Sequence, residues 1–507
     1  MMMFASRLLH PRFLQRQVAF DQEAAGRLFL LLLAAYFILH VVVRVTLTDA
    51  LAMDESEQAL AYAHLRLGYG TQPPLYSWLQ WLFFSVFGFK VLAFALLKNL
   101  ILFALYAGLF LLARPLIGTG AAITASASML LMPEIAWESQ RDLTHTVLLT
   151  AISCWTLCCY FGMLRKPSAW RYALFGLLIG CGLLSKYNYT VFIGGLACAS
   201  LIVREHRRII WNRKMWLAAL IALLCFLPHG TWLLAHLDAA SAGTLAKMRV
   251  GAGPAYIHNL LRGFGSMIWG AIGFLTPLWI VYLIAGWRDF RHPLIERGNA
   301  TARFFLWAYA AFFALMCAIL LSGDISNIKG RWLQQLLFPL PMVCFLLLPS
   351  LARSEVYRRI LYVVTALALA ILLGIPLRVQ LGPYLDKYSR SHYPYPQLSA
   401  ELAQRFPQAD TLIVGEKLAA GNLYFQRPTM PTFLLNRFLA HPTPLNGQLL
   451  FVTPSSMADG QLDSLLRLFP SARIEARGQL KIPYQKSRGE TMAFDYALLA
   501  IAAPRSP

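Results

Sequence analysis

Three acidic residues stand where a carboxylate could act on a hydroxyl group. Asp54 and Glu55 form an adjacent pair just after the first long apolar run, and Asp142 lies just before a later one. A carboxylate placed in this way can accept the proton of an attacking hydroxyl, which is general-base chemistry. A solvated acidic loop or a helix cap accounts for the same acids without any chemistry. The acids alone therefore leave both interpretations open.

Two basic turns provide a second set of candidates. Lys186 follows Ser185 between two apolar runs, and Lys329 and Arg331 lie two positions apart before another. A phosphate group is a natural partner for such cations, because an Arg fork and a Lys point charge both bind phosphate oxygens. The alternative is that these side chains only reach lipid head groups at a membrane surface.

The composition explains which elements must position these residues. Of 507 residues, 58% are hydrophobic and 14% are charged, which is more apolar side chain than one globular core can bury. A helix needs about 20 apolar residues to cross the hydrocarbon layer, and only helices satisfy their own backbone there. We therefore predict an all-α polytopic membrane bundle of about eleven spans. They cover residues 28–47, 91–113, 116–133, 143–163, 172–184, 187–203, 216–235, 266–286, 304–321, 333–350 and 360–380.

The basic residues predict the orientation of this bundle. The formal net charge of +21 sits mainly in short loops at 165–171, 204–214, 288–303 and 353–359, so it does not indicate nucleic-acid binding. Cytoplasmic loops carry such excesses, which makes residues 1–27 a basic cytoplasmic tail. The acids and the turns at Lys186 and Lys329–Arg331 then lie on the opposite side. Basic residues are disfavoured there, and this strengthens the case for an anionic partner.

Two segments outside the predicted spans have their own character. The first external loop, 48–90, contains the aromatic stretch Leu75–Phe84 after two prolines, which favours a helix at the membrane interface. Residues 381–507 predict a soluble C-terminal α/β domain, and 28–380 form the transmembrane domain. Strands are expected at 411–414, 449–453, 472–482 and 492–501, and Leu423-Tyr424-Phe425 is also strand-like.

Several motifs resemble those of a known enzyme family. Met53-Asp54-Glu55, followed by Gln72-Pro73-Pro74-Leu75-Tyr76, is similar to the first-loop motif of the GT-C glycosyltransferases that use polyprenyl-phosphate sugars. These include the protein O-mannosyltransferases and the lipid A aminoarabinose transferases. The resemblance implies that Asp54 is the catalytic base or positions the acceptor, with Glu55 assisting. Gln72 and Tyr76 become candidate substrate-binding residues.

Two further motifs extend the resemblance. Family members carry an Asp where Asp142 stands, although here Arg141 and His145 replace the commoner small or Pro residues. Arg141 and His145 are also candidate substrate-binding residues. The Lys186 turn and the Lys329-Gly330-Arg331-Trp332 turn resemble family turns associated with the phosphate of the lipid-linked donor.

The resemblance implies an inverting transfer of a sugar from a polyprenyl phosphate, on the periplasmic side of a bacterial inner membrane. The acceptor is left open among lipid A, another glycolipid, a polysaccharide and a protein. No residue is assigned as a metal ligand, although nearby carboxylates could hold a divalent cation. No Gly-rich nucleotide loop is present. A flippase for lipid-linked sugars and a non-catalytic binder of them are the alternatives.

Overall fold

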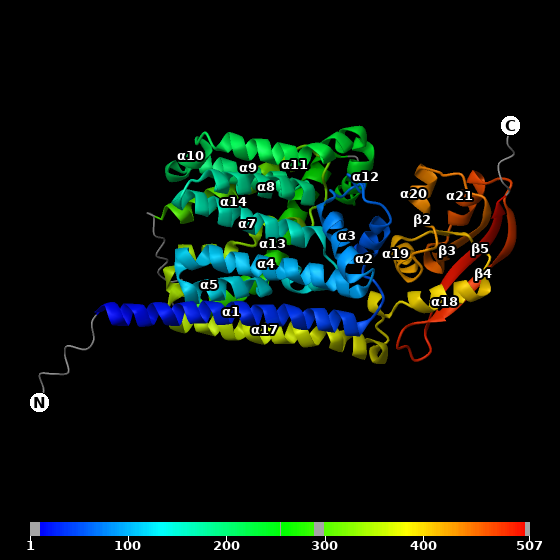
Figure 1. Ribbon diagram of the computed structural model, residues 1–507, viewed down its shortest axis with the longest axis horizontal. Coiled ribbons are helices and arrows are strands. Elements are labelled where there is room, and N and C mark those ends of the chain that lie inside the picture. Colours follow the sequence, from blue (N-terminus) through cyan, green and yellow to red (C-terminus); the bar gives the residue numbers. More distant parts are fainter. Residues whose placement is uncertain (1–10, 254, 288–298, 502–507) are drawn as a thin grey trace, which may run out of the picture. The chain divides into compact units, whose positions relative to one another are not determined.

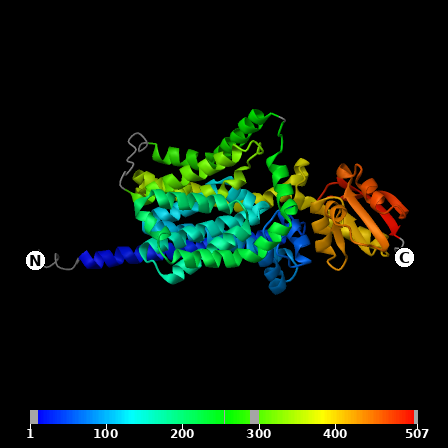
Figure 2. The same ribbon diagram turned by 90° about the horizontal axis from the view of Figure 1, so that it is seen from above.

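The computed structural model describes residues 11–253, 255–287 and 299–501. They form two compact units, each built from several stretches of the chain (Figures 1 and 2). The described parts of residues 1–40, 66–76 and 98–371 make up the bundle unit. The described parts of residues 41–65, 77–97 and 372–507 make up the sheet unit. Residues 1–10 of the predicted tail, part of the basic loop 288–303 and the last six residues lie outside the described residues.

The bundle unit consists of helices that run side by side (Figure 1). Its long helices are α1 (Pro11–Leu47), α4 (Val91–Ile117), α7 (His145–Arg165), α8 (Ala169–Ser185), α9 (Tyr189–Ile202), α11 (Met215–Ala235), α12 (Leu237–Met248), α13 (Tyr256–Gly286), α14 (Ala300–Leu320) and α17 (Ser354–Leu381). Its short helices are α5 (Thr119–Ala127), α6 (Ser139–Arg141), α10 (Arg204–Ile210), α15 (Gln334–Leu337) and α16 (Leu340–Leu347). The ends of α1, α4 and α17 extend into the sheet unit.

The eleven predicted apolar runs all fall on helices. Among the described residues, seven helices are long and apolar enough to cross a membrane alone, and they cover Asp21–Leu47, Val91–Ile117, His145–Arg165, Met215–Ala235, Tyr256–Gly286, Ala300–Leu320 and Ser354–Leu385. The other four runs correspond to shorter apolar helices, at Thr119–Leu131, Ala169–Ser185, Tyr189–Ile202 and Gln334–Leu347. The prediction of a polytopic helical bundle is therefore confirmed.

Small residues let some of these helices approach each other closely. α8 packs along α11, and a Cβ atom added at Gly176 of α8 would come within 2.3 Å of the Ala218 carbonyl oxygen. Close approach at small residues is a common way for membrane helices to associate. Lys186 follows directly after α8, so this packing helps to fix the turn that carries it.

The sheet unit contains a five-stranded mixed sheet in the order β2-β1-β3-β5-β4. The strands are β1 (Thr411–Val414), β2 (Thr432–Leu434), β3 (Gly447–Pro454), β4 (Arg473–Pro483) and β5 (Thr491–Ile501). β1 runs parallel to β2 and β3, whereas β5 runs antiparallel to β3 and β4. Both faces are covered. α18 (Tyr395–Arg405) and α19 (Lys417–Gln426) cover one of them, and α20 (Leu435–Ala440) and α21 (Gln461–Leu468) cover the other.

Alternating side chains explain the two covered faces. Leu412 and Val414 of β1 join one apolar cluster, and Ile413 joins the other, as the period of two in a strand requires. The predicted α/β character of this region and its four predicted strands are thus confirmed. The strand-like interpretation of Leu423-Tyr424-Phe425 is wrong, because these residues belong to α19. The Glu416 carboxylate caps that helix by accepting a hydrogen bond from the Ala419 amide at 2.7 Å.

Two helices of the first predicted loop complete the sheet unit. They are α2 (Met53–Tyr62) and α3 (Leu75–Phe87), of which the second confirms the aromatic helix. Leu51, Ala59, Phe84 and Phe94 form an apolar cluster against which Phe425 of α19 packs. The acidic pair lies in the first turn of α2, after the first span has ended.

Candidate active site

Asp54 occupies the first turn of α2, where the amino end of the helix favours negative charge. Its side chain is half-buried, whereas the next residue, Glu55, is almost completely buried. The two adjacent carboxylates therefore have different surroundings, although the sequence shows them only as a pair. Asp54 keeps part of its surface accessible, as a group that acts on a substrate must.

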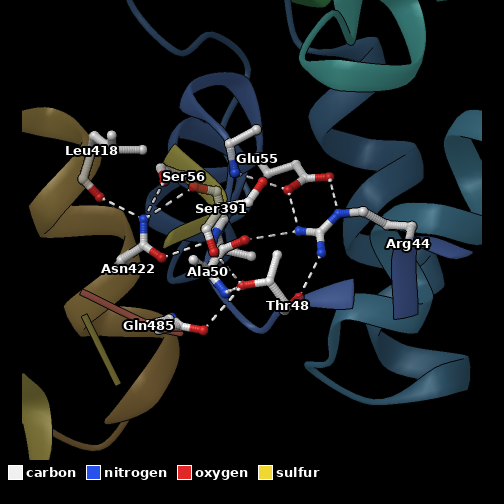
Figure 3. A network of polar contacts seen from close by, with 11 residues as sticks. Arg44, Thr48, Ala50, Glu55, Ser56, Ser391, Leu418, Asn422 and Gln485 are labelled. Carbon is white, nitrogen blue, oxygen red and sulfur yellow. Dashed lines mark hydrogen bonds and ion pairs between the residues drawn. The ribbon is translucent and has the colours of Figure 1, made fainter. Parts of the chain in front are cut away.

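Glu55 is held by Arg44 from the last turn of α1 (Figure 3). Arg44 Nη2 lies 2.7 Å from Glu55 Oε2, and Nε lies 3.3 Å from Oε1. The same guanidinium donates to the carbonyl oxygens of Thr48 at 2.7 Å and Ala50 at 3.1 Å. Glu55 Oε2 also accepts a hydrogen bond from the Ala52 amide at 3.0 Å. This network ties the chain before α2 to the end of α1.

Asn422 of α19 holds the same segment from the other side (Figure 3). Its Oδ1 accepts from the Leu51 amide at 2.7 Å, and its Nδ2 donates to Ser56 Oγ at 3.1 Å. Its neighbour Gly421 packs so closely that an added Cβ would come within 2.3 Å of the Ser56 carbonyl oxygen. An ion pair between Lys417 and Glu57 adds to this contact. The helix that carries Asp54 is therefore fixed by α19 as well as by Arg44.

Asp142 and Arg141 lie just before α7 in the bundle unit. Asp142 is half-buried and precedes Thr144, which stands at the N-cap of α7, so Asp142 is not the cap of that helix. The Arg141 guanidinium is exposed and forms an ion pair with Glu138 at 2.8 Å. The neighbouring Gln140 amide donates to Asn99 Oδ1 of α4 at 3.0 Å. The structure therefore disfavours the helix-cap interpretation of Asp142.

His145 begins α7 and contacts Tyr76, another candidate residue. Both side chains are buried, with ring centroids 5.3 Å apart and planes inclined by 44°. Gln72 lies four residues before Tyr76 in a tight turn, where its carbonyl accepts from the Tyr69 amide at 3.4 Å. Gly70 allows this turn with a φ of 72°. Tyr76 of the first-loop motif and His145 of the second motif thus meet at the start of α7.

Lys186 reaches the same helix start. Its Nζ donates to Thr146 Oγ1 at 2.8 Å, and the side chain is half-buried. Two residues later, the Asn188 amide donates to the Trp332 carbonyl at 3.3 Å. The Lys186 turn and the turn of Lys329 and Arg331 are therefore in direct contact, although 143 positions separate Lys186 from Lys329.

The second basic turn is partly desolvated and faces an acid. Burial, followed by the positive charges of Arg331 and Lys247, lowers the pKa of Lys329. Burial and Glu138 raise the pKa of Glu134, whereas Arg331 acts to lower it. Within the described residues, the buried Arg331 Nε and both amide atoms of Gln334 lack hydrogen-bond partners. Buried polar atoms normally have partners, so this turn has capacity for a polar ligand.

The structure brings most of the bundle-unit candidates together. His145 and Thr146 link Tyr76 to Lys186, and Asn188 links that turn to the one with Arg331. Asp54 and Glu55 belong to the sheet unit. Sequence reasoning did not find Arg44, Thr146, Glu134, Asn188 and Asn422. Arg44 could have been found from its position, because a cation in the last turn of a membrane span needs an anionic partner.

The described residues contain no group of three or more His, Cys, Asp or Glu side chains close enough to hold a metal ion. The divalent cation that the sequence left open therefore has no identifiable ligand set in ranges 11–253, 255–287 and 299–501.

Comparisons with known proteins agree on one family. Residues 71–232 match the model of the dolichyl-phosphate-mannose-protein mannosyltransferases. The lipopolysaccharide core galacturonosyltransferase RgtA of Rhizobium johnstonii is 30% identical over 482 residues, which cover 92% of this chain and 96% of the relative. The lipopolysaccharide core galacturonosyltransferase RgtB of the same organism is 32% identical over 403 residues. These residues cover 79% of this chain and 81% of RgtB.

A solved structure shows the same fold. ArnT from Cupriavidus metallidurans, bound to undecaprenyl phosphate, superimposes with a TM-score of 0.57 at 12% identity, covering 92% of this chain and 97% of that one. The fold and the relatives define a sugar-transferring enzyme embedded in a membrane. The chain belongs to the GT-C glycosyltransferase family, as the resemblance of its first-loop motif implied.

Proposed function

We propose that this glycosyltransferase moves a hexuronic acid residue from a polyprenyl phosphate to the core of lipopolysaccharide, on the periplasmic face of the inner membrane. The sugar and the acceptor are suggested by the names of RgtA and RgtB. The undecaprenyl phosphate bound to ArnT suggests the carrier of the donor.

The observation that carries the donor proposal is the contact between two cationic turns. Lys186 and Arg331 come from distant parts of the sequence, yet the Asn188–Trp332 hydrogen bond joins their turns. The partly desolvated Lys329 lies in the second turn. Together these cations would hold the phosphate of the donor and stabilise its charge as it leaves.

Asp54 is the proposed base. It accepts the proton of the acceptor hydroxyl as the hydroxyl oxygen attacks the anomeric carbon of the sugar. The bond between that carbon and the phosphate oxygen breaks, and the lipid phosphate leaves with the bonding electron pair. A single displacement of this kind inverts the configuration at the anomeric carbon. Asp142 is proposed to position the reacting groups, and Glu55 keeps α2 in place through Arg44.

The test is reconstitution of the full chain in liposomes with a radiolabelled polyprenyl-phosphate hexuronic acid and lipopolysaccharide core. We expect label in the core and free polyprenyl phosphate among the products, identified by mass spectrometry. An intact donor that only changes leaflet would instead identify a flippase. An intact donor that stays bound and does not react would identify a non-catalytic binder.

A further inference from the structure

The end of α17 and the segment after it form a groove that none of the roles above uses. Its volume is about 270 Å³, and Leu377, Leu381 and Leu385 line it together with Arg378 and Lys387. The groove lies wholly within the sheet unit, which includes residues 372–507. It therefore combines an apolar wall with two cations.

The apolar wall continues along one side of the helix. Leu373, Leu377, Leu381 and Leu385 recur every four positions, and each is more than half exposed. Ser354–Leu385 is one of the seven segments that can cross a membrane, so the groove lies at the end of a membrane span. Side chains at such an end meet both acyl chains and head groups. The leucines fit an acyl chain, and the cations beside them fit an anionic head group.

The charges around the groove are mostly positive. Arg378 and Lys387 are exposed, and neither side chain has a hydrogen bond or an ion pair among the described residues. Arg488 adds a third cation, with its guanidinium 4.0 Å from the ring centre of Tyr384. Asp386 is the adjacent acid, whereas Glu490 accepts a hydrogen bond from Tyr388. The cations therefore exceed the nearby acids and remain available to an anion.

The groove is connected to the segment that leads to Asp54. His392 Nε2 donates to the Val379 carbonyl of α17 at 2.7 Å, and the adjacent Ser391 carbonyl accepts from Thr48 Oγ1 at 2.9 Å. Thr48 lies six positions before Asp54 in the same unit. Two hydrogen bonds thus connect α17, at the groove, with the chain that leads to the proposed base.

We propose that the groove binds the lipid-anchored acceptor, with an acyl chain along the leucines and an anionic group at Arg378 and Lys387. The anionic group is a phosphate or a sugar carboxylate, since both accept charge-assisted hydrogen bonds from these cations. The proposal rests on the proposed function, because it concerns the acceptor of the same reaction.

Native mass spectrometry of the full chain in detergent tests the binding. The probes are lipid A with two phosphates, phosphate-free lipid A with a carboxylate-bearing core sugar, and phosphate-free lipid A without an acidic sugar. We expect one or both anionic probes to bind about tenfold more tightly than the neutral one, and R378Q/K387Q to remove that preference. R473Q/K481Q, which changes two exposed cations of β4, is the matched control and should bind as the unmodified chain does.

Three results would overturn the groove as the acceptor site. The first is equal binding of all three probes, and the second is an unchanged preference in R378Q/K387Q. The third is a loss of binding to a plain anionic phospholipid in R378Q/K387Q that is as large as its loss of binding to anionic lipid A. The last result would identify a site for bulk lipid. R378K/K387R keeps the charges and should keep the preference, which separates loss of charge from misfolding.

A transfer assay separates this proposal from the proposed function. R378Q/K387Q should raise the acceptor KM about tenfold and leave the donor KM unchanged. If R378Q/K387Q transfers sugar with an unchanged acceptor KM, the groove is not the acceptor site, and the proposed function still holds. Selective binding of the anionic probes by an unmodified chain that transfers no sugar would reject the proposed function and keep the groove only as a binding site for anionic lipid A.

Discussion

The guanidinium of Arg44 holds both carboxylate oxygens of Glu55, at 2.7 Å and 3.3 Å, with both side chains largely buried. Removing one partner from a buried ion pair costs about 3–5 kcal/mol, because the other charge is left unpaired. We therefore predict that Arg44→Gln lowers the melting temperature of the protein and strongly reduces transfer. Arg27→Gln is the control, since its pair with Glu23 is exposed. Melting temperatures are measured in detergent. Equal values for Arg44→Gln and Arg27→Gln would contradict the structural role of Arg44.

The contact between α19 and α2 makes a second prediction. In Gly421→Ala, the new Cβ would collide with the Ser56 carbonyl oxygen, so α2 must shift. Asn422→Ala removes hydrogen bonds to Leu51 and Ser56, which contribute roughly 1 kcal/mol each. Both variants should lower kcat and leave the donor KM nearly unchanged. Gly273→Ala is the control, because no atom of another segment among the described residues lies within 4 Å of its added Cβ. An unchanged kcat in both variants would show that α19 does not position α2.

Lys186 is predicted to bind the donor. Its Nζ contacts Thr146 at the start of α7, so Lys186→Gln removes a positive charge there and keeps a polar side chain of similar reach. We expect the donor KM to rise about tenfold or more, as for loss of one charge-assisted hydrogen bond. Lys166→Gln changes an exposed lysine after α7 and should have no effect. A donor KM that is the same in both variants would remove Lys186 from the phosphate site.

Lys329 predicts the pH dependence of donor binding. Burial and the neighbouring cations lower the pKa of Lys329, so it loses its proton at a lower pH than an ordinary lysine. The affinity for undecaprenyl phosphate should therefore be full below this lowered pKa and fall as the pH rises through it. Lys329→Arg keeps its charge throughout this range and should shift the fall to higher pH. Isothermal titration calorimetry at a series of pH values measures this affinity. The same pH dependence in Lys329→Arg and in the unmodified protein would contradict a role for Lys329.

The sequence predicted the bundle well because lipid imposes a simple rule. Each apolar run had to become helical, whatever its neighbours, and all eleven fall on helices, although the runs at 116–133 and 333–350 are divided between short ones. Four of the five strands of the C-terminal domain were also predicted, since strands buried on both faces appear as short apolar runs, whereas the three-residue β2 was not. Leu423-Tyr424-Phe425 was misjudged because its aromatic residues favour strands. The Glu416 cap and the packing of α19 against α2 stabilise a helix there instead.

The site could be predicted only in part, for a different physical reason. The types of Asp54, Lys186 and Arg331 indicate chemistry by themselves. The partners that position them come from distant sequence, as Asn422 does for α2 and Asn188 for Trp332. The burial of Glu55 likewise depends on Arg44, which reaches its carboxylate from the end of α1. Such pairings arise from tertiary packing, which local spacing does not determine.

The most direct test of the central claim is the single-turnover rate of Asp54→Asn with saturating labelled polyprenyl-phosphate hexuronic acid and lipopolysaccharide core. Asp49→Asn, which changes an exposed acid five positions earlier, is the control. If Asp54 is the base, its loss should slow transfer by roughly a hundredfold or more, with donor binding intact and the control at the normal rate. Transfer by a folded Asp54→Asn enzyme at the rate of the unmodified protein would contradict the account.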